Sequence, residues 1–217
     1  MDEPIKQIFD AIDLEVSFLH AKWKIFNQLY GDNKDSIELL NEVSPNFFRI
    51  IQDTLVDSVI ITLSRLTDPS TTRIGENSRE NLTFERLLES VDSVKYPTLI
   101  SNLKKTLESL KISCKEIRIQ RNRRIAHLDL KSIIIISEDD ILPHVTKNMV
   151  EEVLKLCRVF MNDISANYSD SEKAYELVSL NDDGRTMLVH LKKSRAYTKH
   201  HLAGILDPVS DKIFHNF

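Results

Sequence analysis

Glycine, proline and cysteine are all scarce in this sequence. Its 217 residues include four glycines, six prolines and two cysteines. With glycine only at positions 31, 75, 184 and 204, the chain contains neither the phosphate-binding P-loop nor the G-x-G-x-x-G turn of dinucleotide-binding domains. The motifs H-E-x-x-H and G-x-S-x-G are also missing. The chain therefore lacks the usual signatures of nucleotide-fuelled enzymes, zinc hydrolases and serine hydrolases.

The sequence also lacks long apolar runs and metal-ligand spacings. No apolar stretch approaches the roughly 18 residues that a membrane-spanning helix needs, and the acidic start MDEP differs from a secretory signal. Cys114 and Cys157 lie in apolar helical patterns, which predicts reduced core residues. His200, His201 and His215 match no standard metal site and are expected in a solvated tail. We therefore expect a cytoplasmic protein that has no membrane association, no metal and no other cofactor.

The residues that are abundant favour helices. Leucine, isoleucine, glutamate and lysine are common while turn-forming residues are few, so the composition predicts an all-α protein. Apolar residues spaced three and four apart predict helices at residues 5–30, 36–42, 45–67, 83–93, 97–128, 146–168 and 183–199. The polar segment 68–80 is predicted to be a loop. The β-branched run 133–136 is too short to decide whether it is extended.

Positive charge is concentrated in two parts of a chain whose net charge is −4. Between Lys104 and Lys131 there are nine lysines and arginines but only three acids. A second stretch, from Gly184 to Leu206, contains five lysines and arginines and no acid. These two stretches predict binding sites for a polyanion.

An arginine interrupts the apolar face of the predicted helix 97–128. At about 100° per residue, residues 103, 107, 110, 114, 117, 125 and 128 form one stripe of this helix. Arg121 lies at the centre of that stripe, and because an arginine cannot lose its charge, a partner or an anion must compensate it. His127 follows, and histidine is suited to proton transfer at neutral pH. Without metal or nucleotide motifs, this combination favours metal-free phosphodiester chemistry.

The segment RNRRIAH, residues 121–127, is similar to the R-x(4–6)-H signature of HEPN domains. Two further segments, LLNEVSPNFFRIIQDTLVDSVIITLSRLTDP (39–69) and NLTFERLL (81–88), occur in the order seen in the abortive-infection, AbiU-like branch of HEPN proteins. The resemblance implies an all-α, HEPN-like helical bundle over residues 1–170 that forms a homodimer through the R-x(4–6)-H helix. The basic helix and tail at 171–217 are expected to pack on the same domain.

The resemblance also implies a metal-independent endoribonuclease that acts as a toxin or in phage defence. His127 would be the acid or base acting on the ribose 2′-OH or the leaving 5′-oxygen, and Arg121 would stabilise charge on the phosphorane. Asn122 would orient one of those groups, and the products would be a 2′,3′-cyclic phosphate and a 5′-OH end. RNA phosphates would be contacted by Arg118, Arg123, Arg124 and Lys115.

Two other functions are compatible with the same residues. The chain would then be a catalytically inactive HEPN module that binds RNA or a partner protein, such as a nucleotidyltransferase-type antitoxin, or a purely structural helical oligomer. In a structural role, Arg121 would be buried against an acid and His127 would cap the helix end. Asp129 is expected to pair with a nearby arginine, and Arg65 with Asp68 at the end of helix 45–67.

Overall fold

Helices account for most of the computed structural model, which describes residues 1–31, 33–75, 77–127, 129–130, 134 and 142–202. The α-helices are α1 (Glu3–Phe26), α2 (Lys34–Val43), α3 (Pro45–Leu66), α4 (Phe84–Ser90), α5 (Pro97–Ser113), α6 (Lys115–Gln120), α8 (Lys147–Ser169) and α9 (Gly184–Leu202). The described residues also form two π-helical segments, η1 (Asn27–Gly31) and η2 (Arg121–Ala126), and a short 3₁₀ helix, η4 (Tyr175–Leu177). The predicted all-α class is confirmed.

The described chain divides into two compact units. Unit 1 comprises residues 1–23 and 55–179, and unit 2 comprises residues 24–54 together with the described residues from 180 onward. The boundary between residues 170 and 171 that the sequence suggests stays a prediction. None of the described helices is long and apolar enough to cross a membrane. Leu128, His215 and most of the run 133–136 lie outside the described residues.

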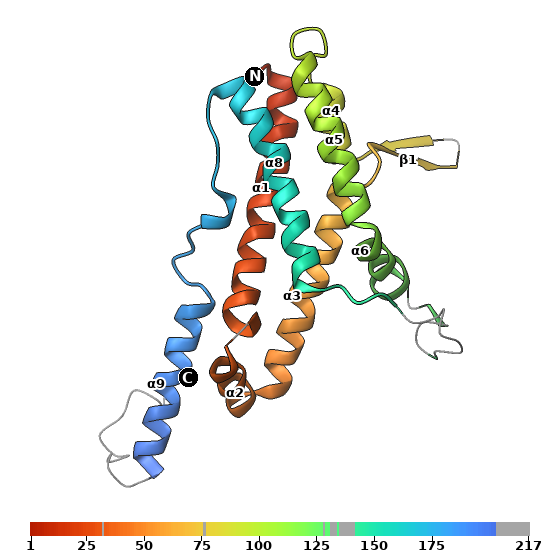
Figure 1. Ribbon diagram of the computed structural model, residues 1–217. Coiled ribbons are helices and arrows are strands. Elements are labelled where there is room, and N and C mark those ends of the chain that lie inside the picture. Colours follow the sequence, from red (N-terminus) through yellow and green to blue (C-terminus); the bar gives the residue numbers. More distant parts are fainter. Residues whose placement is uncertain (32, 76, 128, 131–133, 135–141, 203–217) are drawn as a thin grey trace. The chain divides into compact units, whose positions relative to one another are not determined.

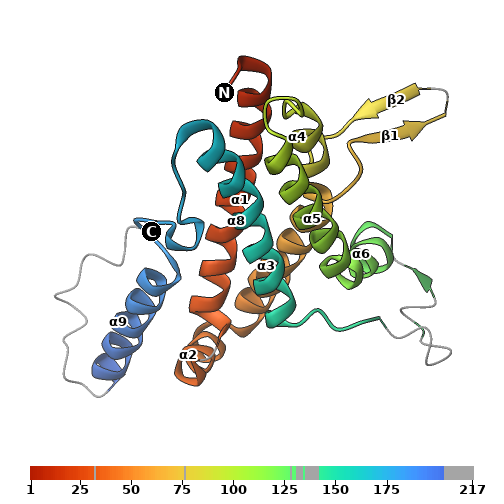
Figure 2. The ribbon, with the colours of Figure 1, turned by 45° about the horizontal axis from the view of Figure 1, so that its top comes forward.

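The core of unit 1 lies where α5 packs against α8 (Figures 1 and 2). Leu103 and Leu110 of α5 are fully buried, as are Cys157 and Phe160 of α8. The Phe160 ring also packs against Phe84 of α4, with 4.9 Å between the ring centroids. The three-four spacing of apolar residues that predicts these helices therefore also identifies the residues that bury their contact faces.

The predicted continuous helix over residues 97–128 is wrong, because the backbone conformation changes at two points. The first change is at Cys114, whose ψ of −1° separates α5 from α6. The second is at Arg121, where the π-helix η2 begins. A π-helix closes its hydrogen bonds over five residues instead of four, so the spacing of 100° per residue no longer applies there. The predicted stripe is buried as far as Ile117, while Ile125 is only half-buried.

The predicted loop at residues 68–80 is also wrong, because part of it forms a β-hairpin. β1 (Thr71–Ile74) pairs antiparallel with β2 (Asn77–Glu80), and Thr72 lies opposite Arg79. Gly75 has a φ of +60° in the turn, a conformation that glycine adopts without strain. The β2 side chains are all exposed, so the alternation of apolar and polar residues that predicts a strand is missing.

Unit 2 has a small core of its own, which α9 shares with α2. Its buried residues are Leu29, Leu39, Leu40, Phe48 and Leu188. At the start of α9, the Gly184 amide donates to Oε1 of Gln28 over 2.9 Å, and a Cβ at position 184 would lie only 3.0 Å from the Gln28 Cβ. A larger residue at this position would therefore require the side chains of Gln28 and Leu29 to shift by a few tenths of an ångström.

Candidate functional site

The segment RNRRIAH coincides with the π-helix η2 and its C-cap. Arg121 is the first residue of η2 and has helical φ and ψ angles of −56° and −48°. His127 caps the segment in an extended conformation. Single turns of π-helix are rare and occur often at functional sites, because they redirect side chains that an α-helix would place elsewhere. The local backbone thus sets this segment apart from the helices before it.

Arg121 is compensated by a carboxylate from the same chain. Its Nη2 donates to both oxygens of Asp68, over 3.0 and 3.1 Å. Arg118 donates to the same carboxylate and to the backbone oxygen of Thr67, and over 2.8 Å to the Thr67 hydroxyl. The side chains of Asp68 and both arginines are about a quarter exposed, at 25 to 27%. The charge of Arg121, which the sequence places in the apolar stripe, is therefore paired with an acid of the same chain.

Asp68 reaches this position because α3 ends just before it. Pro69 cannot donate a backbone hydrogen bond and disfavours helical φ and ψ at the residue before it, so the helix stops at Leu66. The buried Thr67 hydroxyl donates back to the Leu63 carbonyl over 2.8 Å, which holds the first residue after the helix. Arg118 at this C-terminus also faces the negative end of the helix dipole.

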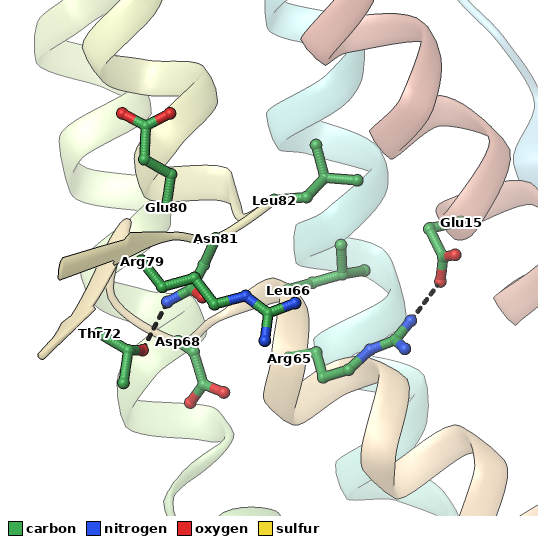
Figure 3. Close-up of a pocket in the computed structure, with 9 residues that line it drawn as sticks. All are labelled: Glu15, Arg65, Leu66, Asp68, Thr72, Arg79, Glu80, Asn81 and Leu82. Atoms are coloured by element: carbon green, nitrogen blue, oxygen red, sulfur yellow. Dashed lines mark hydrogen bonds and ion pairs between the residues drawn. The ribbon is translucent and has the colours of Figure 1, made fainter. Parts of the chain in front are cut away.

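The predicted ion pair between Arg65 and Asp68 is wrong. Arg65 instead pairs with Glu15 of α1, with 2.8 Å between Nη2 and Oε2 (Figure 3). Asp68 lies only three residues after Arg65, but its carboxylate is taken by two arginines from α6 and η2. The nearest cation in sequence is therefore not the partner.

The Arg121–Asp68 contact leaves part of the guanidinium without a partner. Nε of Arg121 is buried and has no hydrogen-bond acceptor. Within the described chain, no acceptor binds Nη1 either. Because two guanidinium groups share one carboxylate, the cluster of Arg118, Arg121 and Asp68 carries a net positive charge. A second anion, such as a phosphate, would complete it.

The other predicted RNA-binding residues differ in whether an acid of the same chain pairs with them. Nε of Arg123 donates to Asp129 over 2.9 Å, which confirms that Asp129 pairs with a nearby arginine. Arg124 forms an ion pair with Asp57 of α3. Lys115 is exposed, and no acid in the described part of the chain pairs with it. Asp57 of α3 and Asp129 thus reduce the positive charge that the arginines of this segment carry.

His127 and Asn122 are both exposed, and no hydrogen bond in the described residues joins either to Arg121. The chain after His127 is held by Asp129, whose amide donates to the carbonyl oxygens of Arg123 and His127, both over 3.0 Å. Together with the Arg123–Asp129 ion pair, these bonds close the turn that follows η2. The structure therefore pairs Arg118, Arg121 and Arg124 with acids in or just after α3 and leaves the histidine at the surface.

Sequence reasoning missed Asp57 and the role of Asp68, both of which pair with η2. Each is more than 50 residues before its arginine, so no helical spacing connects them. The signal that does exist is the pair of arginines, Arg118 and Arg121, at a three-residue spacing on one helix face. Two guanidinium groups on one half-buried face require a common anion, although the sequence does not say which one.

Metal ligands and reactive thiols are the other chemistries to consider among the described residues. These residues contain no group of three or more histidines, cysteines and acids that could hold a metal ion. Both cysteines are buried, as predicted. Burial raises the pKa of the Cys114 thiol to about 11, and it raises that of Cys157 well above the usual value. At neutral pH both are therefore thiols, which are poor nucleophiles and ligands.

Comparison with known families identifies the family of the chain. The family model HEPN_AbiU2, described as AbiU2, matches residues 2–187. The matched span contains the R-x(4–6)-H segment and both of the other segments that carry the resemblance. No match is found among curated proteins or among solved structures.

Proposed function

The chain belongs to the AbiU2 family of HEPN domains, which is associated with abortive infection, and on this premise we propose that it is a metal-independent endoribonuclease. The observation that carries the proposal is the state of Arg121. It stands at the start of a π-helix, its side chain is 27% exposed, and it belongs to a cluster with an excess of positive charge. This state supports the proposal, because a guanidinium in a cluster with excess positive charge can stabilise negative charge on a phosphate.

The reaction that we propose is an internal transfer on RNA. His127 removes the proton of the 2′-OH, the 2′-oxygen forms a bond to the adjacent phosphorus, and the bond from phosphorus to the 5′-oxygen breaks. A proton is delivered to the leaving 5′-oxygen, so the products are a 2′,3′-cyclic phosphate and a 5′-OH end. Arg121 stabilises the charge on the phosphorane, and Asn122 orients one of the reacting groups.

A homodimer suits this reaction because it needs both a base and an acid. One chain provides a single histidine in the R-x(4–6)-H segment. If two such segments meet at one cleft, one His127 accepts the proton from the 2′-OH while His127 of the partner subunit donates a proton to the 5′-oxygen. The exposure of His127 supports this arrangement, since the imidazole is accessible to RNA and to a second copy.

Asp68 is a positioning residue in this proposal. Both of its oxygens accept from Nη2 of Arg121, so the plane of the guanidinium is fixed and Nη1 is left for a phosphate oxygen. Arg118 keeps the carboxylate in place from the other side and offsets part of its negative charge. RNA phosphates further along the strand are contacted by Lys115, Arg118, Arg123 and Arg124.

The alternative is a catalytically inactive module that binds RNA or a partner protein, such as a nucleotidyltransferase-type antitoxin. One observation favours it: Arg121, Arg123 and Arg124 each pair with an acid of the same chain. In that case the arginines would stabilise the fold, and the surface with His127 would serve for binding alone.

Incubation with total RNA in EDTA separates the two functions. We expect wild-type protein to cleave RNA without a metal, and both Arg121→Ala and His127→Ala to lower the rate at least about 100-fold. Arg73→Ala, an exposed arginine in β1, is the matched control and should cleave like wild type. Equal cleavage by all variants would reject this site, while no cleavage by any protein would favour the binding module.

A further inference from the structure

A cavity in unit 1 lies directly beside the R-x(4–6)-H segment. It has a volume of about 460 Å³, within the roughly 300–1,000 Å³ typical of ligand sites. Its walls come from α1, the end of α3, and the hairpin with the residues after it, and they are formed by Glu15, Arg65, Leu66, Asp68, Thr72, Arg79, Glu80, Asn81 and Leu82 (Figure 3). Asp68 belongs to both sites, because the same carboxylate binds Arg121.

The acids of this cavity are all paired with arginines. Glu15 pairs with Arg65 over 2.8 Å. Glu80 pairs with Arg86 over 3.3 Å. Asp68, as described above, pairs with two arginines. A carboxylate that is already neutralised repels an incoming anion far less than a free one. Because Arg86 also pairs with Glu89 over 3.2 Å, Glu80 is only partly compensated, and the pairing of the three acids weakens their repulsion of an anionic ligand without removing it.

Among the arginines that line the cavity, Arg79 has no acidic partner in the described residues. Figure 3 shows the Arg79 side chain extending from β2 over the cavity, whereas the guanidinium of Arg65 points toward Glu15. The base of the hairpin is anchored by Asn81, whose Nδ2 donates to the Thr72 hydroxyl over 2.7 Å and to the Pro69 carbonyl over 2.9 Å. The hairpin that carries Arg79 is thus held in place at its base.

We propose that this cavity binds a backbone phosphate of the RNA strand whose scissile phosphate lies at Arg121, an inference that rests on the proposed function. The Arg79 guanidinium provides a fork that matches two phosphate oxygens, while Arg65 stays paired with Glu15. The Thr72 hydroxyl contributes a polar group. The shared Asp68 places the two phosphate sites next to each other along one strand.

The lining favours a phosphate of a strand over a free nucleotide. None of the described residues that line the cavity is aromatic, so no ring is available to stack a base. The polar groups are instead charged or hydroxyl and amide groups, which suit phosphate and ribose. A strand held also at the R-x(4–6)-H segment gains affinity from both contacts, whereas a single nucleotide would have only one.

The experiment measures the binding of an RNA oligonucleotide with 2′-O-methyl riboses, which cannot be cleaved by 2′-OH attack. We compare wild type, Arg79→Ala and Arg73→Ala in EDTA at several salt concentrations. We expect Arg79→Ala to weaken binding about tenfold and to reduce the salt slope by about 0.7, the value for one phosphate contact on a single strand. Arg73, exposed on the paired strand β1 and outside the cavity, should show wild-type binding.

Several outcomes would overturn the inference. The first is an unchanged dissociation constant and salt slope for Arg79→Ala, and the second is an equal loss of affinity in Arg79→Ala and Arg73→Ala. The third comes from a parallel titration with adenosine monophosphate, in which Arg79→Ala loses binding of the nucleotide while its RNA binding is unchanged. Arg79→Lys, which keeps the charge, should recover part of the affinity, and thermal unfolding confirms that each variant is folded. If wild type cleaves RNA and Arg79→Ala binds RNA as tightly as wild type does, only the proposed phosphate site in the cavity is rejected. If Arg79→Ala binds RNA more weakly than wild type and wild type does not cleave RNA, only the proposed nuclease activity is rejected.

Discussion

Asp68 is the residue on which the geometry of the R-x(4–6)-H segment depends most. One carboxylate holds two guanidinium groups that could not be left unpaired in a half-buried position without a cost in free energy. This explains why an arginine is tolerated in the apolar stripe of the helix. It also means that the structural and the proposed catalytic role of Arg121 coexist in one side chain.

Replacing Asp68 should therefore destabilise the protein. Breaking a buried ion pair costs about 3–5 kcal/mol, and since these side chains are a quarter exposed, we expect Asp68→Asn to lower the free energy of unfolding by about 1–3 kcal/mol. Asp57→Asn is the matched control, because Asp57 pairs with the single, more exposed Arg124 and should cost less than about 1 kcal/mol. Urea denaturation measures both, and equal losses would contradict a special role for Asp68.

His20 predicts how stability depends on pH. Burial, followed by the charge of Arg158, lowers its pKa to about 4 from the usual 6.5. Below pH 6.5 the unfolded chain binds a proton that the folded chain rejects, so stability falls as the pH drops from about 6.5 toward 4, by up to about 3 kcal/mol. We expect His20→Leu to flatten this part of the profile in urea denaturation at successive pH values. An unchanged slope would show that another group is responsible.

At the scale of elements, the sequence predicts what depends on local pattern and misses what depends on distant partners. α3 begins at Pro45 and ends before Pro69 as predicted, because proline acts on its immediate neighbours. The hairpin was not predictable, since Arg79 and the other β2 residues are polar and exposed. The pairing of Arg121 with Asp68 joins residues 53 apart, which no periodicity in the sequence records.

The packing of α5 on α8 provides a test of the predicted core. Leu103 is 0% exposed on the side of α5 that faces the core, and Leu103→Ala should lower the free energy of unfolding by about 3–4 kcal/mol through lost burial and a cavity. Ile112 lies on the same helix but is 73% exposed, so Ile112→Ala should change it by less than about 0.5 kcal/mol. Chemical denaturation compares the two. Similar losses would mean that α5 is oriented differently.

At the scale of the whole molecule, the proposed reaction requires two copies of the chain. Sedimentation equilibrium should give a mass twice that of the 25.1 kDa chain at concentrations where RNA is cleaved. The physical reason is the need for an acid and a base at one phosphate, with one histidine in each R-x(4–6)-H segment. Full cleavage activity by a species of single-chain mass would refute the shared cleft.

The most direct test of the central claim is the single-turnover cleavage of a defined RNA in EDTA, with chemical identification of the new ends. We predict 2′,3′-cyclic phosphate and 5′-OH ends for wild type, and rates at least about 100-fold lower for Arg121→Ala and His127→Ala. Arg73→Ala should retain the wild-type rate. Wild-type rates in either site variant, or ends that carry a 5′-phosphate, would contradict catalysis by Arg121 and His127.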